Sequence, residues 1–289
     1  MKRVLLLAGF IFIFSSFSYA AKPAKSKKVP KGFVFIEGTT LKGGQKYKGP
    51  KNNYVFIEGR TIELKDFYIC DHEVTYSEFY YDSGKYDKAE KNKPASFTWS
   101  RAIEYCNKRS IKEGLTPCYS GADNYVTCDF EADGYRLPTL AEWIYAAMGG
   151  KQGVAVDEPV MYAGTNDSSE LGDYAWYIDN CGWNPEREYS EYHPHDVKKK
   201  KPNLLGLYDM SGNLWEWCWD WYGAIDENTP FTGPERGTPI DKFNSTARVL
   251  AGGSYKNKDY DCCVTAQSWG QISANGIGVR LVRSKLSRN

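Results

Sequence analysis

Residues 215–221 alternate tryptophan with another residue type without a break, in the order Trp-Glu-Trp-Cys-Trp-Asp-Trp. Because successive side chains of a β-strand point to opposite faces, a strand here places four indole rings on one face and Glu216, Cys218 and Asp220 on the other. The tryptophan face predicts a core strand. If the other face is also buried, its two carboxylates need partners such as water, an arginine or a metal ion.

Three further segments carry the signals of helices. Thr75-Tyr76-Ser77-Glu78 and Thr139-Leu140-Ala141-Glu142 are capping boxes, and the second predicts a helix through Met148 that stops at Gly149-Gly150. Residues 99–113 place apolar side chains on one helical face and are followed by Gly114. Residues 151–203 show little periodicity, which predicts irregular, loop-rich structure.

The charge balance limits the kinds of partner. The 37 Lys and Arg residues and 36 Asp and Glu residues leave a net charge of +1. General nucleic-acid binding needs a basic surface, so we expect no nucleic-acid partner. A hydrophobic content of 42% also excludes a disordered chain, a collagen and a coiled coil.

The first 20 residues have the pattern of a secretory signal peptide. A basic start precedes an apolar run from Val4 to Phe14, and Ser18-Tyr19-Ala20 ends the segment. The run is too short to span a bilayer, so we expect no transmembrane segment. The sequence therefore predicts an exported protein of the periplasm or cell surface. Residues 21–52, rich in lysine, are expected to form a solvated N-terminal arm. Two near-identical pieces, residues 34–38 and 55–59, have the pattern of short strands with a Gly- and Lys-containing loop between them.

The eight cysteines leave two alternatives open. An exported chain can keep disulfides, and Cys118 and Cys128 flank a Gly-Asp-Asn turn region, so they could bridge a hairpin. The alternative is that the cysteines are buried free thiols. The adjacent Cys262 and Cys263 are too close in the chain to bridge each other.

Four motifs occur in order along the chain. They are Gly134-Tyr135-Arg136-Leu137-Pro138-Thr139-x-x-Glu142-Trp143, the run from Gly206 to Trp217, Gly252-Gly253-Ser254, and Ile277-Gly278-Val279-Arg280. With these motifs the chain resembles the formylglycine-generating enzyme (sulfatase-modifying factor) domain family. The resemblance implies an α+β fold of the C-type-lectin-like kind, rich in irregular structure, over a domain at residues 53–289.

The same resemblance bears on catalysis. It implies an oxidase with two cysteines, three and eight positions after Ser254, that bind copper(I) and oxidise a substrate cysteine with oxygen. Cys262 occupies the second position, but Asn257 occupies the first. An amide cannot replace a thiolate ligand. We therefore expect no enzyme and no copper, with the copper-dependent formylglycine-generating oxidase as the alternative.

Residues 252–282 are predicted to be a display region. Gly252-Gly253-Ser254 and the run from Ile277 to Val282 bracket a mixed segment without a sustained period, which resembles the variable region of proteins diversified by retroelements. Aromatic rings and small polar side chains together are typical of binding surfaces. We expect a monomer that binds an unknown protein or glycan. The alternatives are an ordinary C-terminal sheet facing water and an envelope protein without a variable site. The expected ligand-binding residues are Tyr255, Asn257, Asp259, Tyr260, Asp261, Cys263, Thr265, Gln267, Trp269, Gln271, Ser273 and Asn275.

The resemblance also implies a structural calcium site. Its ligands would be Asp209, Gly212, Leu214 and Glu216, with backbone carbonyls from Gly212 and Leu214. Hard oxygen ligands suit Ca²⁺. The alternative is that the two carboxylates only hydrogen-bond a turn.

Overall fold

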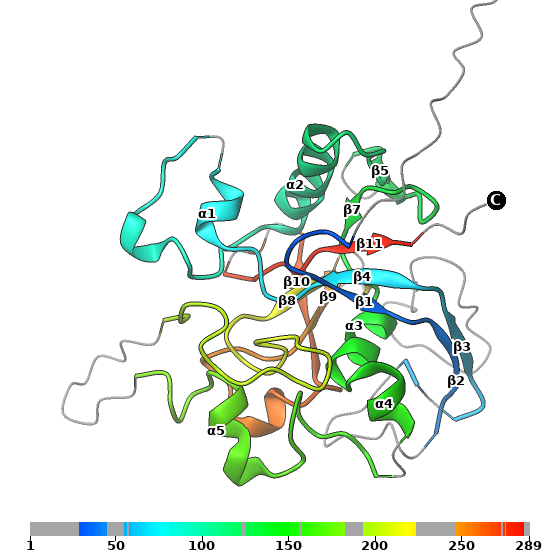
Figure 1. Cartoon of the computed structure of the whole chain (residues 1–289), viewed down its shortest axis with the longest axis vertical. Coiled ribbons are helices and arrows are strands. Elements are labelled where there is room, and N and C mark those ends of the chain that lie inside the picture. Colours follow the sequence, from blue (N-terminus) through cyan, green and yellow to red (C-terminus); the bar gives the residue numbers. More distant parts are fainter. Residues whose placement is uncertain are drawn as a thin grey trace, which may run out of the picture.

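The computed structural model shows a mixed α+β fold with few helices and small sheets (Figure 1). It describes residues 29–44, 55–56, 58–81, 83–122, 125–155, 158–182, 193–223, 247–272, 274 and 276–285. The fold class implied by the resemblance is confirmed. In chain order the strands and α-helices are β1 (Phe33–Ile36), β2 (Thr39–Lys42), β3 (Thr61–Leu64), β4 (Phe67–Cys70), α1 (Tyr76–Phe79), α2 (Trp99–Lys112), β5 (Tyr119–Ser120), β6 (Thr127–Cys128), β7 (Tyr135–Arg136), α3 (Leu140–Ala147), α4 (Gly150–Ala155), α5 (Leu171–Tyr174), β8 (Glu216–Trp221), β9 (Ala247–Ala251), β10 (Gln267–Gln271) and β11 (Val282–Ser284).

Two antiparallel sheets organise the domain. The four-stranded sheet has the order β1-β4-β11-β7, and the three-stranded sheet has the order β10-β9-β8. In the view of Figure 1, α2 lies above β7 and β11, and α3 lies below β1 and β4. The strand orders show that both sheets join segments that are far apart in the sequence.

Strand β8 separates two hydrophobic clusters, as its alternation predicts. Trp217 and Trp219 pack into the cluster that includes the apolar face of α2, whereas Cys218 packs into the cluster around α3. The indole of Trp217 donates to the carbonyl of Phe97 at 3.0 Å, and the indole of Trp99 donates to the carbonyl of Cys218 at 3.3 Å. The predicted core strand is confirmed, and both of its faces are buried.

The helix starts also form as the capping boxes predict. In α1 and α3 the threonine side chain accepts from the N3 backbone, while the N3 glutamate accepts from the threonine backbone. Helix α2 ends at Lys112, and Gly114 adopts a φ of +68° just beyond it. Capping satisfies amide groups that the first turn of a helix leaves unbonded.

The domain packing begins before residue 53, which corrects the boundary expected from composition. Strand β1 pairs with β4 along its whole length, and β2 pairs with β3. Ile36 and Leu41 are buried in the cluster around α3. Strand β1 confirms the strand predicted at residues 34–38, whereas β2 was not predicted, and Val55 and Phe56 of the second predicted strand lie in a bend. The predicted signal peptide lies outside the described residues.

Within the described residues, the helices are all too short or too polar to cross a bilayer. The cysteines, all eight of which are described, are free thiols. Cys128 lies opposite Tyr119 in the β5–β6 pair, while Cys118 precedes β5. Of the two alternatives, disulfides or free thiols, the structure therefore supports free thiols.

Candidate functional site

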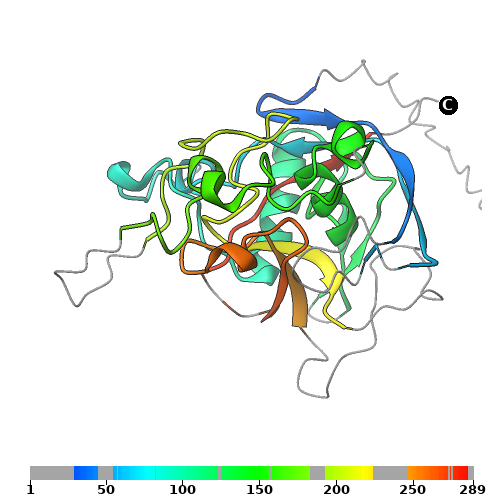
Figure 2. The same cartoon turned by 90° about the horizontal axis from the view of Figure 1, so that it is seen from below.

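The described part of the display region is fixed by backbone hydrogen bonds to three distant segments. The amide of Tyr255 donates to Asn213 at 2.8 Å, the carbonyl of Asn257 accepts from Ile178 at 3.0 Å, and the amide of Val264 donates to Met161 at 2.9 Å. In Figure 2 this segment, drawn in orange, lies across the loops that follow α4 and α5. The segment therefore has a defined path although little of it is regular structure.

Asn257 closes a tight turn in this segment. Its side-chain oxygen accepts from the Ser254 hydroxyl at 2.6 Å, and its side-chain nitrogen donates to Asp261 at 3.2 Å. A short 3-10 helix over Asp259–Asp261 completes the turn. The structure thus brings Asn257 and Asp261 together, and the hydrogen bond between their side chains stabilises the turn.

Two aromatic side chains of the region are prominent at the surface. Tyr260 is 47% exposed on the 3-10 helix, and Trp269 is 43% exposed on β10, where its ring centroid lies 6.3 Å from that of Tyr222. Six other predicted ligand-binding residues are partly exposed. They are Tyr255, Asn257, Asp259, Asp261, Gln267 and Gln271.

Two predicted ligand-binding residues do not reach the surface. Cys263 and Thr265 are 0% and 1% exposed, and the Cys263 thiol donates to the Tyr260 carbonyl at 3.3 Å. Both residues follow the 3-10 helix into the interior, where Cys263 joins a small hydrophobic cluster with Leu171. Their burial does not fit the expected contact with a ligand, which stays a prediction for these two residues. Ser273 and Asn275 lie outside the described residues.

The position of the family's second catalytic cysteine is also closed to solvent. Cys262 is fully buried, and its thiol lies 3.9 Å from the carbonyl of Ser254. Burial raises the pKa of the Cys262 thiol well above its usual range, and the nearby carboxylate of Asp261 raises it further. The thiol is therefore protonated at neutral pH. Cys262 and the adjacent Cys263 both pack inward after the 3-10 helix.

A buried charge cluster includes Arg280, near the C-terminal end of the display region. Arg280 is fully buried and donates through Nη2 to Glu216 Oε1 at 2.7 Å. The other Glu216 oxygen accepts from the Trp143 indole at 2.7 Å. Arg280 also donates to the backbone carbonyls of Cys70 and Tyr208. The buried carboxylate of Glu216 on β8 therefore has an arginine as its partner.

Glu73 belongs to the same cluster, and sequence reasoning missed it. Its carboxyl group accepts from the side chain of Asn213 at 2.6 Å and from the amide of Leu214 at 3.0 Å. Burial, together with the nearby Asp209 and Glu216, raises the pKa of Glu73 well above its usual range. Glu73 directly follows the turn after β4, but no spacing in the sequence links it to residues 213–216.

The hydrogen bonds of Glu216 do not fit its expected role as a calcium ligand. Both of its oxygens accept N–H donors from Arg280 or Trp143, so a cation there would displace an arginine. Asp209 differs, because its Oδ2 accepts from the Lys198 amide at 2.8 Å while its Oδ1 has no hydrogen-bond partner. Burial raises the pKa of Asp209 to about 6. Calcium binding stays a prediction, and Asp209 is the only carboxylate of the expected set whose bonding leaves an oxygen for it.

His195 lies beside the attachment points of the display region. Its ring stacks on Trp176 with centroids 3.8 Å apart, and its Nε2 lies 3.4 Å from the carbonyl of Cys181. Burial lowers the pKa of His195, and the positive charges of His193, Lys93 and Lys200 lower it further. The folded state therefore favours the neutral ring.

This arrangement predicts a loss of stability in mild acid. Because the pKa of His195 is lower in the folded state, the unfolded chain binds a proton more readily below about pH 6.5. The stabilising contribution is present above that pH and falls as the pH decreases. Urea titrations at pH 7.5 and 5.5 should show a loss from this group of no more than about 1 kcal/mol, since the ring is partly exposed.

His195→Phe should reduce the pH dependence, because phenylalanine keeps the stacking on Trp176 but cannot be protonated. His193→Phe is the comparison variant, since His193 is more exposed; it should change the pH dependence less than His195→Phe does, because it removes only one of the positive charges near His195. Equal pH dependence in wild type and His195→Phe would show that His195 does not contribute.

Comparison with known proteins places these features in a family. The model of the sulfatase-modifying factor enzyme 1-like domain matches residues 19–285. The chain belongs to this family. The match begins before β1, in agreement with the strand pairing that corrects the domain boundary. The sulfatase-modifying-factor motifs from Gly206 to Trp217 and at Arg280 supply the buried charge cluster described above.

Individual members of the sulfatase-modifying factor family resemble the chain to different extents. The structure of Treponema denticola variable protein 1 is similar with a TM-score of 0.68 and 29% identity, over 88% of this chain and 95% of that one. Chaperone protein LppX of Paenibacillus barcinonensis is 36% identical over 92% of this chain and 94% of its own length. The formylglycine-generating enzyme of Streptomyces coelicolor is 34% identical over 45% of this chain and 38% of the enzyme.

Proposed function

We propose that the protein is an exported, non-catalytic ligand-binding protein that displays a retroelement-diversified region, residues 252–282, on a rigid scaffold. One observation carries the proposal. Tyr260 and Trp269 are exposed on a segment whose backbone is bonded to three distant parts of the fold. The likeness to a variable protein over most of both chains supports it.

The exposed chemistry suits a protein or glycan ligand. Tyr255, Tyr260 and Trp269 offer flat rings with few rotatable bonds, and such side chains bind with a small entropy cost. Lys256, whose ammonium lies 5.4 Å from the Tyr255 ring centroid, and Asp259 add charges of both signs. Aromatic anchors surrounded by polar groups are typical of the energetically important parts of interfaces.

Two features argue against the oxidase. A copper(I) site of the family's kind needs two thiolates, which are soft ligands. Asn257 uses its amide to close the turn, and Cys262 is fully buried. The first position therefore lacks a thiolate, and the second does not present its sulfur at the surface.

The lack of oxidase chemistry is a direct prediction. Purified protein supplied with copper(I), oxygen and a sulfatase-type cysteine peptide should leave the peptide unchanged by mass spectrometry. The formylglycine-generating enzyme of Streptomyces coelicolor serves as the positive control. Conversion of the peptide that disappears in Cys262→Ser would refute the proposal.

The DNA sequence around the gene tests the proposal that a retroelement diversifies residues 252–282. We expect a reverse transcriptase near the gene and a repeat copy of the codons for residues 252–282 that differs only at adenines. In a second strain, substitutions should concentrate in residues 255–275. Evenly distributed substitutions and no reverse transcriptase would favour an envelope protein without a variable site.

A second candidate function follows from the similarity to LppX, which covers nearly the whole of both chains. That protein is named a chaperone, and a chaperone binds other chains while they are unfolded. Light scattering of reduced, aggregating lysozyme separates the two functions. A display protein should leave the aggregation unchanged, whereas suppression that persists in Trp269→Ala would favour a chaperone.

A further inference from the structure

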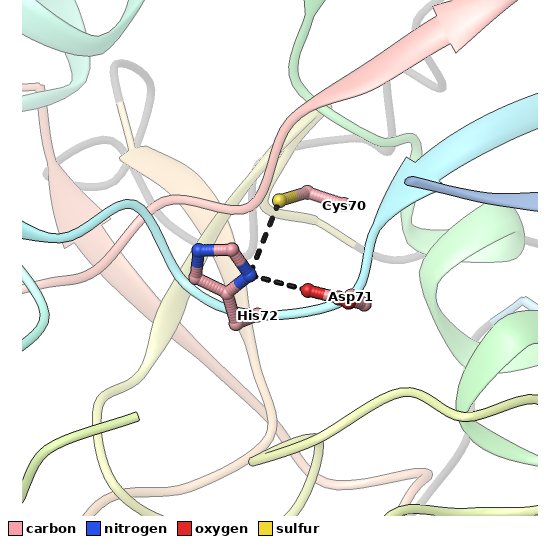
Figure 3. A group of neighbouring side chains, drawn as sticks. All are labelled: Cys70, Asp71 and His72. Atoms are coloured by element: carbon pink, nitrogen blue, oxygen red, sulfur yellow. Dashed lines mark hydrogen bonds and ion pairs between the residues drawn. The ribbon is translucent and has the colours of Figure 1, made fainter. Parts of the chain in front are cut away.

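Cys70, Asp71 and His72 form a group of potential metal ligands outside the display region. Cys70 ends β4, and the two following residues make a turn whose backbone is fixed at both sides. The amide of Asp71 donates to Gly32 at 2.8 Å, and its carbonyl accepts from Tyr208 at 2.9 Å. Figure 3 shows that the Cys70 thiol and the Asp71 carboxylate both point at Nδ1 of His72.

We propose that these three residues bind a zinc ion. One ligand atom from each of the three lies within 4.8 Å of the others, and Cys70 Sγ lies 3.7 Å from His72 Nδ1. In a tetrahedral zinc site, bonds of about 2.3 Å to sulfur and about 2.0 Å to nitrogen place these two atoms about 3.5 Å apart. The sulfur and nitrogen are therefore already spaced as zinc requires.

The surroundings of His72 independently point to a metal ion. His72 Nε2 lies 3.3 Å from Glu78 Oε2, and the Thr75 amide donates to the same oxygen at 2.8 Å. A histidine that binds a metal through one nitrogen typically donates the other N–H to a carboxylate. Glu78 thus directs the ring so that Nδ1 faces Cys70 and Asp71.

One contact between the ligand atoms has to be replaced when zinc binds. Lys198 donates to Asp71 Oδ2 at 2.9 Å, and Asp71 Oδ1 is paired with His72 Nδ1. On zinc binding the Nδ1 proton leaves to solvent, and the carboxylate moves away from the nitrogen so that both atoms contact the ion. Sulfur, nitrogen and oxygen donors together favour zinc over calcium or magnesium, which prefer oxygen alone. The side chains of Asp71 and His72 are each 17% exposed, so water can complete the coordination. The Cys70 thiol loses its proton to solvent when the sulfur–zinc bond forms.

Cobalt(II) is the probe for this site, because a thiolate–cobalt bond absorbs in the near ultraviolet. The full chain, stripped with EDTA and kept reduced, should bind one equivalent of Co²⁺ with this absorption, and Zn²⁺ should displace it. Ca²⁺ should not. No thiolate absorption in folded wild-type protein would overturn the proposal.

Variants locate the site. Cys70→Ser should abolish the thiolate absorption and weaken zinc binding by at least about tenfold, whereas Cys128→Ser, the matched cysteine control, should change neither. Glu78→Gln should keep the absorption but weaken zinc binding by about tenfold, because His72 loses its charged partner while an amide oxygen can still accept from the Thr75 backbone in the capping box. This variant also provides a test if Cys70→Ser fails to fold. Thiolate absorption that persists in folded Cys70→Ser, or zinc affinity unchanged in Glu78→Gln, would contradict the assignment.

Discussion

Arg280→Met should lower the free energy of unfolding by about 3–5 kcal/mol, the largest effect expected in this protein, because it leaves Glu216 charged and buried without its partner. The guanidinium group also donates to the carbonyls of Cys70 and Tyr208, so the substitution removes donors from three acceptors on different segments. Urea denaturation followed by tryptophan fluorescence measures the change.

Lys201→Met is the matched control for a surface ion pair. Lys201 lies 2.7 Å from Asp173, but both side chains are well exposed. Exposed pairs contribute about 0–1 kcal/mol, so the control should lose little stability. The double variant Arg280→Met, Glu216→Leu should recover part of the loss, because no charge is then left buried. Equal losses for Arg280→Met and Lys201→Met would contradict the role given to the buried pair.

Trp269→Ala should weaken ligand binding by about 2 kcal/mol or more, which corresponds to about thirtyfold. The side chain is large and exposed, so its removal should change the free energy of unfolding by less than about 1 kcal/mol. Tyr260→Ala should behave in the same way. As the ligand is unidentified, the probe is a pool of peptides selected from a random library against the wild-type chain, with affinities measured by interferometry.

Tyr125→Ala is the control for the display surface. Tyr125 is 86% exposed but lies next to β6, outside residues 252–282. The peptides should bind this variant as tightly as wild type. If Trp269→Ala and Tyr260→Ala also bind them normally, the exposed aromatic side chains are not the binding surface, and the proposed function loses its main support.

Local signals in the sequence predicted local structure well. The two capping boxes are complete because each involves residues three positions apart, so chain geometry alone determines them. The alternation in β8 likewise predicts which side chains share a face. Near the N-terminus, the pattern of residues 34–38 predicted a strand that overlaps β1, whereas β2 was not predicted, because its pairing with β3 is not a local signal.

The candidate site was predicted in outline and not in detail. The partnership of Glu216 with Arg280 spans 64 positions, and that of Glu73 with Asn213 spans 140, so no local pattern reports either. Cys263 and Thr265 were assigned to the surface because the whole segment was treated as exposed. Instead, the 3-10 helix over Asp259–Asp261 turns the chain inward directly after Tyr260.

The way the display region is attached affects which sequences it can accept. At Tyr255 and Asn257 the attachments to neighbouring segments use peptide groups, which do not depend on the identity of the side chain. Proline is the exception, since it has no N–H to donate. A population of such proteins could therefore exchange Tyr255 for nearly any other amino acid without losing the loop path, and proline should be missing from that position in every natural copy.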